Sequence, residues 1–220
     1  MNLGVSVICA FNDRQKLDAF LIPSLRKQTS PYELLLVDNT RGRYTSATEV
    51  LNETARRAGF DHLMFVHQDV SLNSEHWLRE ARGSVSRLKR CGAAGVAGSN
   101  RRGTWASVFH GDPPRLAGRR VRKPVEVQTL DGCLIIAPKA VFETVRFDAA
   151  HKSWYLYVAD YCLDLARHGY RSYVLPGDVY HESPGPPHPD TYEDARKYMI
   201  EKYRDDMGVV HTTVGSWKTR

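Results

Sequence analysis

The sequence predicts a single α/β domain with a mostly parallel central sheet and helices on both of its faces. Two observations support this fold class. Apolar runs alternate with segments of helical periodicity along the first half of the chain, as in successive strand–helix units. The apolar runs are also continuous rather than alternating, which is typical of parallel strands buried on both faces. Connections between such strands are right-handed. Because the strands run in the same direction, the residues that follow each strand gather at one edge of the sheet.

The individual elements follow from these patterns. Strands are predicted at Leu3 to Phe11, Glu33 to Val37, His62 to Val66, Ala93 to Ala97, Val125 to Thr129, Gly132 to Ala137 and Tyr170 to Pro176. Helices are predicted at Leu17 to Leu25, Ser46 to Ala58, Glu75 to Arg90, Pro138 to Val145, Asp160 to His168 and Tyr192 to Arg204. The stretch from Ser99 to Pro124 is rich in Gly, Arg and Pro and predicts a long, mobile, basic loop. A Pro-rich loop is expected at 184–189. The domain is expected to cover residues 1–206, with 207–220 as a C-terminal tail.

Composition narrows the class of protein. The chain has 220 residues, 42% of them hydrophobic and 25% charged, which is ordinary for a globular protein. Its four cysteines form no CxxC pair and are interpreted as reduced core thiols, so we expect a cytoplasmic protein. We expect no signal peptide and no transmembrane span. The net charge of +6 is compatible with a solvated basic loop, a phosphate-bearing ligand, an anionic membrane face or nucleic acid.

Polar residues come at or soon after the ends of four predicted strands. They are Asn12, Asp38-Asn39, His67-Gln68-Asp69 and, after a short turn, His181. Ligands of open parallel sheets bind at this edge, so these positions are the first candidates for a binding site. A carboxylate such as Asp69 suits Mg²⁺ or Mn²⁺ bridging two phosphates, and His181 is a candidate second ligand. The alternatives are that Asp69 caps the next turn and that His181 is a structural histidine.

Two further acids are candidates on the same reasoning. Asp131-Gly132 precedes an apolar strand, and the glycine would allow a ligand to approach the backbone closely, unless the pair is an ordinary turn. Asp160 follows the aromatic residues Trp154, Tyr155 and Tyr157. Apolar surroundings would raise its pKa toward that of a useful general base. The alternative is that Asp160 lies in the first turn of a helix and interacts with the helix dipole.

Taken in order, these segments resemble the GT-A glycosyltransferases of family 2. More closely, the chain is similar to a bacterial glycosyltransferase-like subfamily with an HQDV motif at the metal site. The resemblance rests on VSVICAFND, LLLVDNT, NETARRAGFDHLMFVHQDV, LDGCLIIAPK, WYLYVADYCLDLARHGYRSYVLP and VYHESPG, and it covers roughly Leu3 to Gly185. The resemblance departs from the family pattern at three places. His67 replaces the first acid of the common DXD motif, Tyr155 replaces a histidine, and Val158 and Ala159 stand where many relatives have acids.

The resemblance implies a role for each matching residue. Asp69 and His181 would hold the metal, and Asp160 would be the general base. The donor would be bound by Ala10, Phe11, Asn12, Asp38, Asn39, Gln68, Asp131, Gly132 and Trp154. The implied reaction is an inverting, metal-assisted transfer of a sugar from a nucleoside diphosphate sugar, UDP- or dTDP-linked, to an acceptor hydroxyl. The acceptor would be a glycan, a lipid-linked sugar or a small molecule.

Two other functions remain open. One is a catalytically weak protein that binds nucleotide sugars on the same fold. The other is a basic nucleic-acid-binding domain, although the sequence lacks a basic stripe interleaved with aromatics, so no nucleic-acid partner is expected. Peripheral contact with an anionic membrane at the inner face is left open, as is the role of the 99–124 segment, which is a candidate for closing over the donor.

Overall fold

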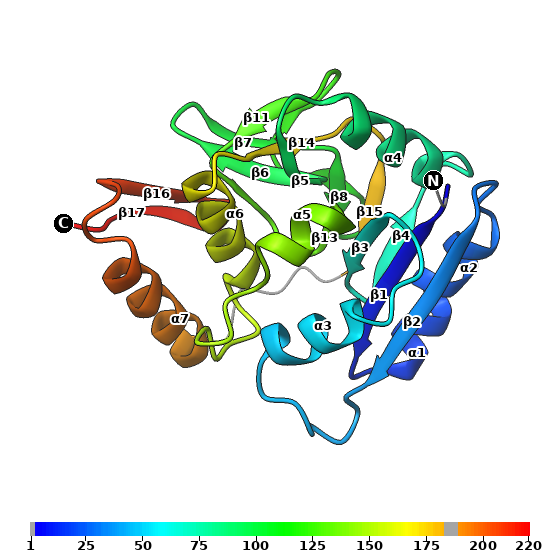
Figure 1. Cartoon of the computed structure of the whole chain (residues 1–220). Helices are drawn as coiled ribbons and strands as arrows, with labels where there is room; N and C mark the ends of the chain where they lie inside the picture. Colours follow the sequence, from blue (N-terminus) through cyan, green and yellow to red (C-terminus); the bar gives the residue numbers. More distant parts are fainter. Residues whose placement is uncertain (1–2, 183–188) are drawn as a thin grey trace.

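A seven-stranded sheet forms the centre of the molecule (Figure 1). The computed structural model describes residues 3–182 and 189–220. The strands lie in the order β11-β14-β5-β13-β3-β1-β2. Their bounds are β1 (Val5–Phe11), β2 (Tyr32–Asp38), β3 (His62–Val66), β5 (Cys91–Gly95), β11 (Val125–Val127), β13 (Leu134–Pro138) and β14 (Arg171–Val174).

Most of these strands are parallel, as the sequence predicts. β1 pairs in parallel with β2 and with β3, and β14 pairs in parallel with β5. β13 lies between β3 and β5 and is antiparallel to both, while β11 is an antiparallel edge strand. The ends of β1, β2 and β3 therefore open at the same edge of the sheet, where the predicted site residues follow them.

Helices cover both faces of the sheet (Figure 1). The side chains of β1 show the division, because Val5, Val7 and Cys9 pack on one side and Ile8 on the other. The first side is covered by α1 (Arg14–Ala19), α2 (Leu21–Arg26) and α4 (Trp77–Arg87). The second side is covered by α3 (Ala47–Ala55), α5 (Lys139–Thr144) and α6 (Tyr157–Arg167). The last helix, α7 (Pro189–Lys202), packs against α6 through Met199 and Leu163.

The prediction of a long mobile loop at 99–124 is wrong. This segment forms short strands in two small sheets, ordered β10-β7-β6-β12 and β4-β15-β8-β9. The bounds are β4 (Val70–Leu72), β6 (Ala97–Asn100), β7 (Gly103–Ala106), β8 (Val108–His110), β9 (Arg115–Leu116), β10 (Arg119–Arg120), β12 (Thr129–Leu130) and β15 (Val179–His181). Ala106, Val108 and Val121 are buried and anchor the segment. Strands this short leave too few residues for a periodic pattern to show.

The end of the chain, for which the sequence indicates no element, forms a hairpin of β16 (Val209–Thr212) and β17 (Gly215–Lys218). The hairpin is tied to the body of the molecule. The Gln128 side chain donates to the Val209 carbonyl at 3.0 Å and accepts from the His211 amide at 2.6 Å. Residues 209–218 are therefore packed rather than detached, although the boundary after residue 206 stays a prediction.

The four cysteines are free and buried, which agrees with their interpretation as core thiols. The expected Pro-rich loop at 184–189 lies outside the described residues, except for its last residue, which begins α7. In the described part of the chain, no helix is both long enough and apolar enough to cross a membrane.

Candidate functional site

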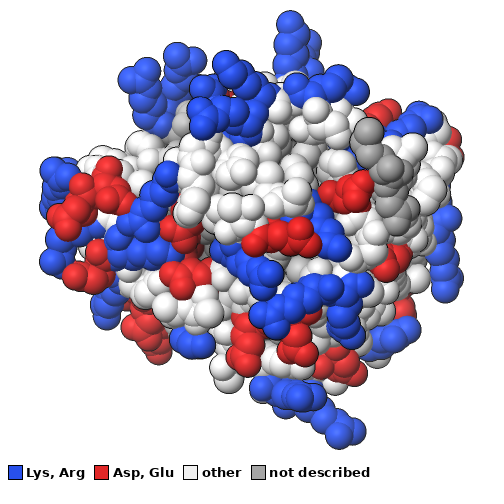
Figure 2. Space-filling model, in the orientation of Figure 1, with Lys and Arg blue, Asp and Glu red and all other residues white. Residues whose placement is uncertain are grey.

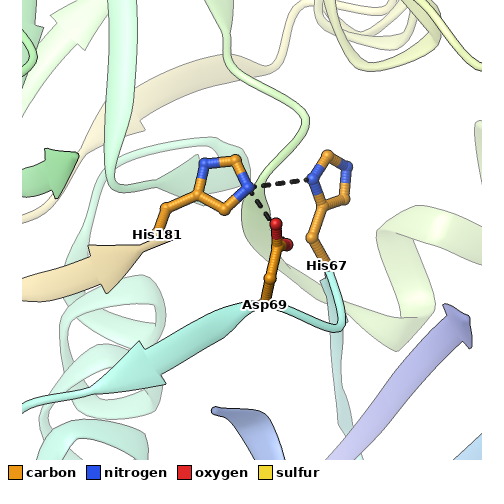
Figure 3. A group of neighbouring side chains, drawn as sticks. All are labelled: His67, Asp69 and His181. Carbon is orange, nitrogen blue, oxygen red and sulfur yellow. Dashed lines mark hydrogen bonds and ion pairs between the residues drawn. The ribbon is translucent and has the colours of Figure 1, made fainter. Parts of the chain in front are cut away.

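Three side chains converge where β3 ends (Figure 3). The chain turns through 67–69 between β3 and β4, and the His67 amide donates to the Cys133 carbonyl at 2.9 Å. His181 is the last residue of β15, which pairs antiparallel with β4 and places it opposite Val70. Two strands far apart in sequence thus bring His181 to the 67–69 turn. We call His67, Asp69 and His181 the metal cluster.

The atoms of the metal cluster face one another. Nε2 of His181 lies 3.2 Å from Oδ1 of Asp69 and 3.4 Å from Nδ1 of His67 (Figure 3). One nitrogen or oxygen of each residue lies within 4.8 Å of the others. Nδ1 of His181 is buried and has no hydrogen-bond partner within the described residues. Two imidazoles and a carboxylate at this spacing form a donor set that suits a divalent transition metal such as Mn²⁺.

Burial and neighbouring groups keep His67 and Asp69 in the protonation states that a metal requires. Burial, assisted by the neighbouring His181, lowers the pKa of His67 to about 4, so its imidazole is neutral at pH 7. Burial would raise the pKa of Asp69. The hydrogen bond from His181 and favourable electrostatic interactions with the two histidines outweigh burial and bring the pKa of Asp69 to about 2. The cluster therefore offers an ionised carboxylate and a neutral nitrogen ligand, as metal binding demands.

A pocket of about 360 Å³ opens beside the metal cluster at the sheet edge. Its lining includes seven residues expected from the sequence, namely Ala10, Phe11, Asn12, Asn39, Gln68, Asp69 and Trp154. Gln68 ties β3 to β1, because its Oε1 accepts from the amides of Asn12 at 2.9 Å and Asp13 at 2.8 Å. Its Nε2 donates to Oδ1 of Asn12 at 2.7 Å. We call this cavity the first pocket.

Asp38 lies beside the first pocket without lining it. It pairs with Phe11 at the end of β2, and the Asn39 amide donates to the Phe11 carbonyl at 2.8 Å. The exposed Asp38 carboxylate accepts from the Thr40 hydroxyl at 2.7 Å and the Thr40 amide at 2.8 Å. These hydrogen bonds lower its pKa. Asn39 instead orders the following loop through Tyr44, whose amide and carbonyl it binds.

A second pocket of about 520 Å³ adjoins the first. His67, Trp154, Tyr155 and Tyr157 line both cavities, so the metal cluster lies at their junction. Asp131 and Gly132 line the second pocket, together with residues that the sequence did not single out, among them His110, Arg115, Tyr192 and Thr213.

Asp131 is firmly held in the second pocket. It accepts from the Cys133 amide at 2.9 Å and from the Thr213 hydroxyl at 2.7 Å. Burial would raise its pKa, but these hydrogen bonds prevail and lower it. The carboxylate is therefore ionised at neutral pH, with an acceptor bond on each of its two oxygens.

His110 is the closest of the missed residues to the metal cluster. β8 pairs in parallel with β15 and places His110 opposite His181. The two rings are 5.1 Å apart, and Nδ1 of His110 lies 3.2 Å from the His181 carbonyl. The signal available in the sequence was a histidine ending the short apolar run VFH, hidden within the basic segment.

The surroundings of Asp160 favour a structural role over the predicted role of general base. Asp160 is completely buried and lines neither pocket. Its Oδ1 accepts from Lys202 at 2.8 Å and Tyr203 at 2.6 Å, and its Oδ2 lies 3.1 Å from Nδ1 of His151. Burial alone would raise its pKa, but His151 and Lys202 lower it, which is opposite to the expected direction. In this arrangement the Asp160 carboxylate therefore faces neither pocket.

Asp160 belongs to a structural group instead. The Lys202 ammonium donates to Asp148 at 2.7 Å and to Asp164 at 2.7 Å, in addition to Asp160. We call these four residues the lysine cluster. It joins α6 to α7, and the cation at its centre already neutralises part of the carboxylate charge.

The 99–124 segment does not line the first pocket, so the described arrangement gives no support to its closing over the donor there. Its middle part, including His110 and Arg115, lines the second pocket instead.

Comparison with protein families places this site in context. A model of a glycosyltransferase-like family matches residues 7–203, which is most of the chain. The chain belongs to this glycosyltransferase-like family. The match includes the metal cluster and the whole lining of the first pocket, and it extends through α7, whereas Thr213 and Val214 of the second pocket lie beyond it.

Solved structures show that this family member has a GT-A fold. GalNAc-T7 with UDP, GalNAc and Mn²⁺ superposes with a TM-score of 0.65 at 13% identity, covering 90% of this chain and 48% of that one. TarS from S. aureus with UDP-GlcNAc gives 0.60 at 17%, covering 93% and 68%. The mannosyltransferase PcManGT from Pyrobaculum calidifontis with GDP-Man and Mn²⁺ gives 0.58 at 15%, covering 93% and 63%. No curated protein sequence matches the chain.

The glycosyltransferase-like chain is shorter than these neighbours, and it spans about half the length of GalNAc-T7. At such low identities the likeness concerns the fold alone.

Proposed function

We propose that this chain transfers a glycosyl group from a nucleoside diphosphate sugar to an acceptor hydroxyl, with a divalent cation held by Asp69 and His181. The observation that carries the proposal is the metal cluster at the junction of two pockets in a GT-A fold. His67 completes the ligand set, and the HQDV stretch that contains it is the proposed metal motif. Mn²⁺ suits two imidazoles better than Mg²⁺ does, because Mg²⁺ prefers oxygen ligands.

The first pocket is the proposed nucleotide site. Phe11 supplies an apolar wall for the base, and Asp38 lies beside Phe11, within reach of a base or ribose that extends past the pocket edge. Asn12 and Gln68 are locked together by hydrogen bonds and are positioned to orient the donor. When bound, the metal neutralises the negative charge of the departing diphosphate. The structural neighbours contain UDP, UDP-GlcNAc and GDP-Man, and we propose UDP or dTDP as the nucleotide here.

The second pocket is the proposed acceptor site. In an inverting displacement, the acceptor oxygen forms a bond to the anomeric carbon while the bond from that carbon to the diphosphate breaks. The acceptor proton must pass to a base. Of the carboxylates among the described residues, Asp131 lines this pocket, and we propose it in place of Asp160. Trp154 and Tyr157, which line both pockets, offer apolar faces for the two sugars.

A second candidate function is binding of a nucleotide sugar without efficient transfer. One observation favours it. Both Asp131 oxygens already accept hydrogen bonds, and Asp160 is enclosed in the lysine cluster. A base restrained in this way would remove a proton slowly.

The first experiment is calorimetric titration with UDP, with and without Mn²⁺, on the wild type and on Asp69→Ala. Metal-dependent binding that the substitution abolishes would support the donor site, and dTDP and GDP should be tested in the same way. Asp194→Ala is the matched control, because Asp194 is exposed on α7 and belongs to neither cluster. Failure of all three nucleotides to bind with metal present would refute the proposal. An assay of sugar release and of transfer to an acceptor then distinguishes the two candidate functions, because only a transferase consumes the donor efficiently.

A further inference from the structure

A third cavity, of about 630 Å³, lies apart from the two pockets and shares no lining residue with them. Its walls include Asn100, Arg101, Arg102 and Trp105 from the β6–β7 hairpin, and His211 from β16. We call it the basic groove. Figure 2 shows Lys and Arg side chains gathered along the edge of the molecule where β7 and β11 lie.

The charge of the basic groove is not compensated. Arg101 and Arg102 are exposed and form no ion pair with any described residue, and the same holds for Arg122 just outside the groove. The carboxylate of Glu126 in its wall is taken by Arg171 at 2.7 Å. A concave surface lined by unpaired cations raises the local concentration of anions and favours their binding.

One aromatic ring provides a flat apolar surface among these cations. Trp105 is half-buried, and its indole nitrogen lies 3.4 Å from Oδ1 of Asn100, which fixes the ring. The Arg119 guanidinium lies 5.7 Å from the centre of the indole. An indole face beside guanidinium groups suits a ligand that has both apolar ring faces and negative charges, as an acidic sugar does.

The C-terminal hairpin borders both the basic groove and the second pocket. His211 lines the groove and Thr213 lines the pocket, and these two residues of the hairpin are separated by about 7 Å along an extended strand. A chain molecule of a few sugar units is long enough to occupy both cavities.

We infer that the basic groove binds an acidic glycan chain, whose end enters the second pocket as the acceptor. This inference rests on the proposed function, because the second pocket is the proposed acceptor site. Arginines set beside an indole ring in a concave surface suit a charged sugar chain better than the flat face of a membrane. Single-stranded nucleic acid normally stacks successive bases on several aromatic side chains, whereas Trp105 is the one such ring in this wall.

The experiment measures binding of two acidic glycans, oligogalacturonate and dextran sulfate, with neutral dextran as the reference. The test variant is Arg101→Glu with Arg102→Glu. The matched control is Arg56→Glu with Arg57→Glu, an equal change of charge at exposed positions after α3, away from both pockets. At least one acidic glycan should bind the wild type. The test variant should weaken that binding by about tenfold or more, and the control by less than about twofold.

The dependence of glycan binding on salt distinguishes contacts to the arginines from stacking on Trp105. Raised ionic strength should weaken wild-type binding because it screens the arginines. Trp105→Ala should weaken binding by a similar factor at low and at high salt, since stacking does not depend on charge. UDP binding with Mn²⁺ should be unchanged in both the arginine and the tryptophan variants, which also shows that they are folded.

Three results would overturn the inference. They are no binding of either acidic glycan to the wild type, equal weakening by the test and control variants, and tighter binding of anionic vesicles or of a single-stranded oligonucleotide than of both glycans. If the wild type binds an acidic glycan but does not bind UDP with Mn²⁺, the proposed function is refuted and the glycan-binding groove remains.

Discussion

The metal cluster and the lysine cluster both hold ionised carboxylates, yet the two clusters differ in the groups that face those carboxylates. In the lysine cluster, an ammonium occupies the centre and donates to all three carboxylates. In the metal cluster, no lysine or arginine of the described residues forms an ion pair with Asp69, and the atoms that face one another are a carboxylate oxygen and two imidazole nitrogens. The first group is complete within the protein, whereas the second has ligand atoms to offer.

The difference separates structural from functional clusters. Both groups have carboxylates whose pKa values lie well below normal, so a shifted pKa does not distinguish them. Position does, because the metal cluster lies at the junction of two pockets and the lysine cluster joins two helices away from both. The following predictions test this contrast.

Lys202→Met should cause the largest loss of stability. The substitution leaves Asp160 and its two neighbours as buried or half-buried carboxylates without their cation. Breaking a buried ion pair by removing one partner costs about 3–5 kcal/mol. Urea unfolding monitored by circular dichroism measures the loss. Lys197→Met, on the exposed face of the same helix, is the control and should change stability by less than about 0.5 kcal/mol. Equal stability of the two variants would contradict a structural role for the cluster.

Asp69→Asn should have the opposite effect to Lys202→Met, with a large loss of UDP binding and a small loss of stability. It removes an anionic metal ligand, so Mn²⁺-dependent UDP binding should weaken by on the order of 100-fold, at least as much as when a supporting partner of a ligand is lost. Stability without metal should change little, because Asn retains an oxygen for His181. Calorimetry and urea unfolding on the same sample give both quantities. A variant that unfolds readily but binds UDP with Mn²⁺ normally would show that the two clusters had been assigned the wrong way round.

Asp160→Asn tests most directly whether Asp160 is a structural residue or the general base. Losing the charge beside Lys202 and His151 should lower stability by about 1–3 kcal/mol. If Asp160 were the general base, the turnover rate would fall about 100- to 10,000-fold. We expect less than a tenfold change in kcat at a temperature where the variant is folded, measured as sugar release or transfer. Asp131→Asn, assayed in parallel, should show the large decrease instead.

How well the sequence predicts each feature depends on how far apart in the chain the interacting residues lie. β3 is predicted with its exact bounds, and Asp69 follows it directly, so local order alone brings Asp69 to the sheet edge. His181 is predicted to follow the strand Tyr170 to Pro176 after a short turn, whereas it ends a separate short strand, β15, that the sequence did not predict. The nature of Asp160 depends on Lys202, 42 residues later on α7, and no local pattern reveals how α7 packs. His110 was missed for the same reason, because it lies beside His181 through strand pairing 71 residues apart.

The fold shows a similar limit. The parallel strands β1, β2 and β3 are recognisable because each is a continuous apolar run, and helices follow β1 and β2 directly. β13 is also an apolar run, but its insertion between β3 and β5 in antiparallel orientation depends on pairing that its own residues do not encode. The 99–124 segment was mistaken for a loop because its strands contain two to four residues each.

The smallest effect that separates the two clusters is expected in acid. Hydrogen bonds and charge from Lys202 and Tyr198 outweigh burial and lower the pKa of Asp148 from 3.8 to about 2. The unfolded chain therefore takes up a proton at higher pH than the folded one, so this carboxylate stabilises the fold above about pH 4. The contribution should disappear as the pH falls from 4 to 2. Asp148→Asn should flatten the dependence of the urea midpoint on pH in that window, whereas Asp194→Asn, at an exposed site, should not. Equal slopes in the wild type and both variants would mean that Asp148 is not held by the lysine in solution.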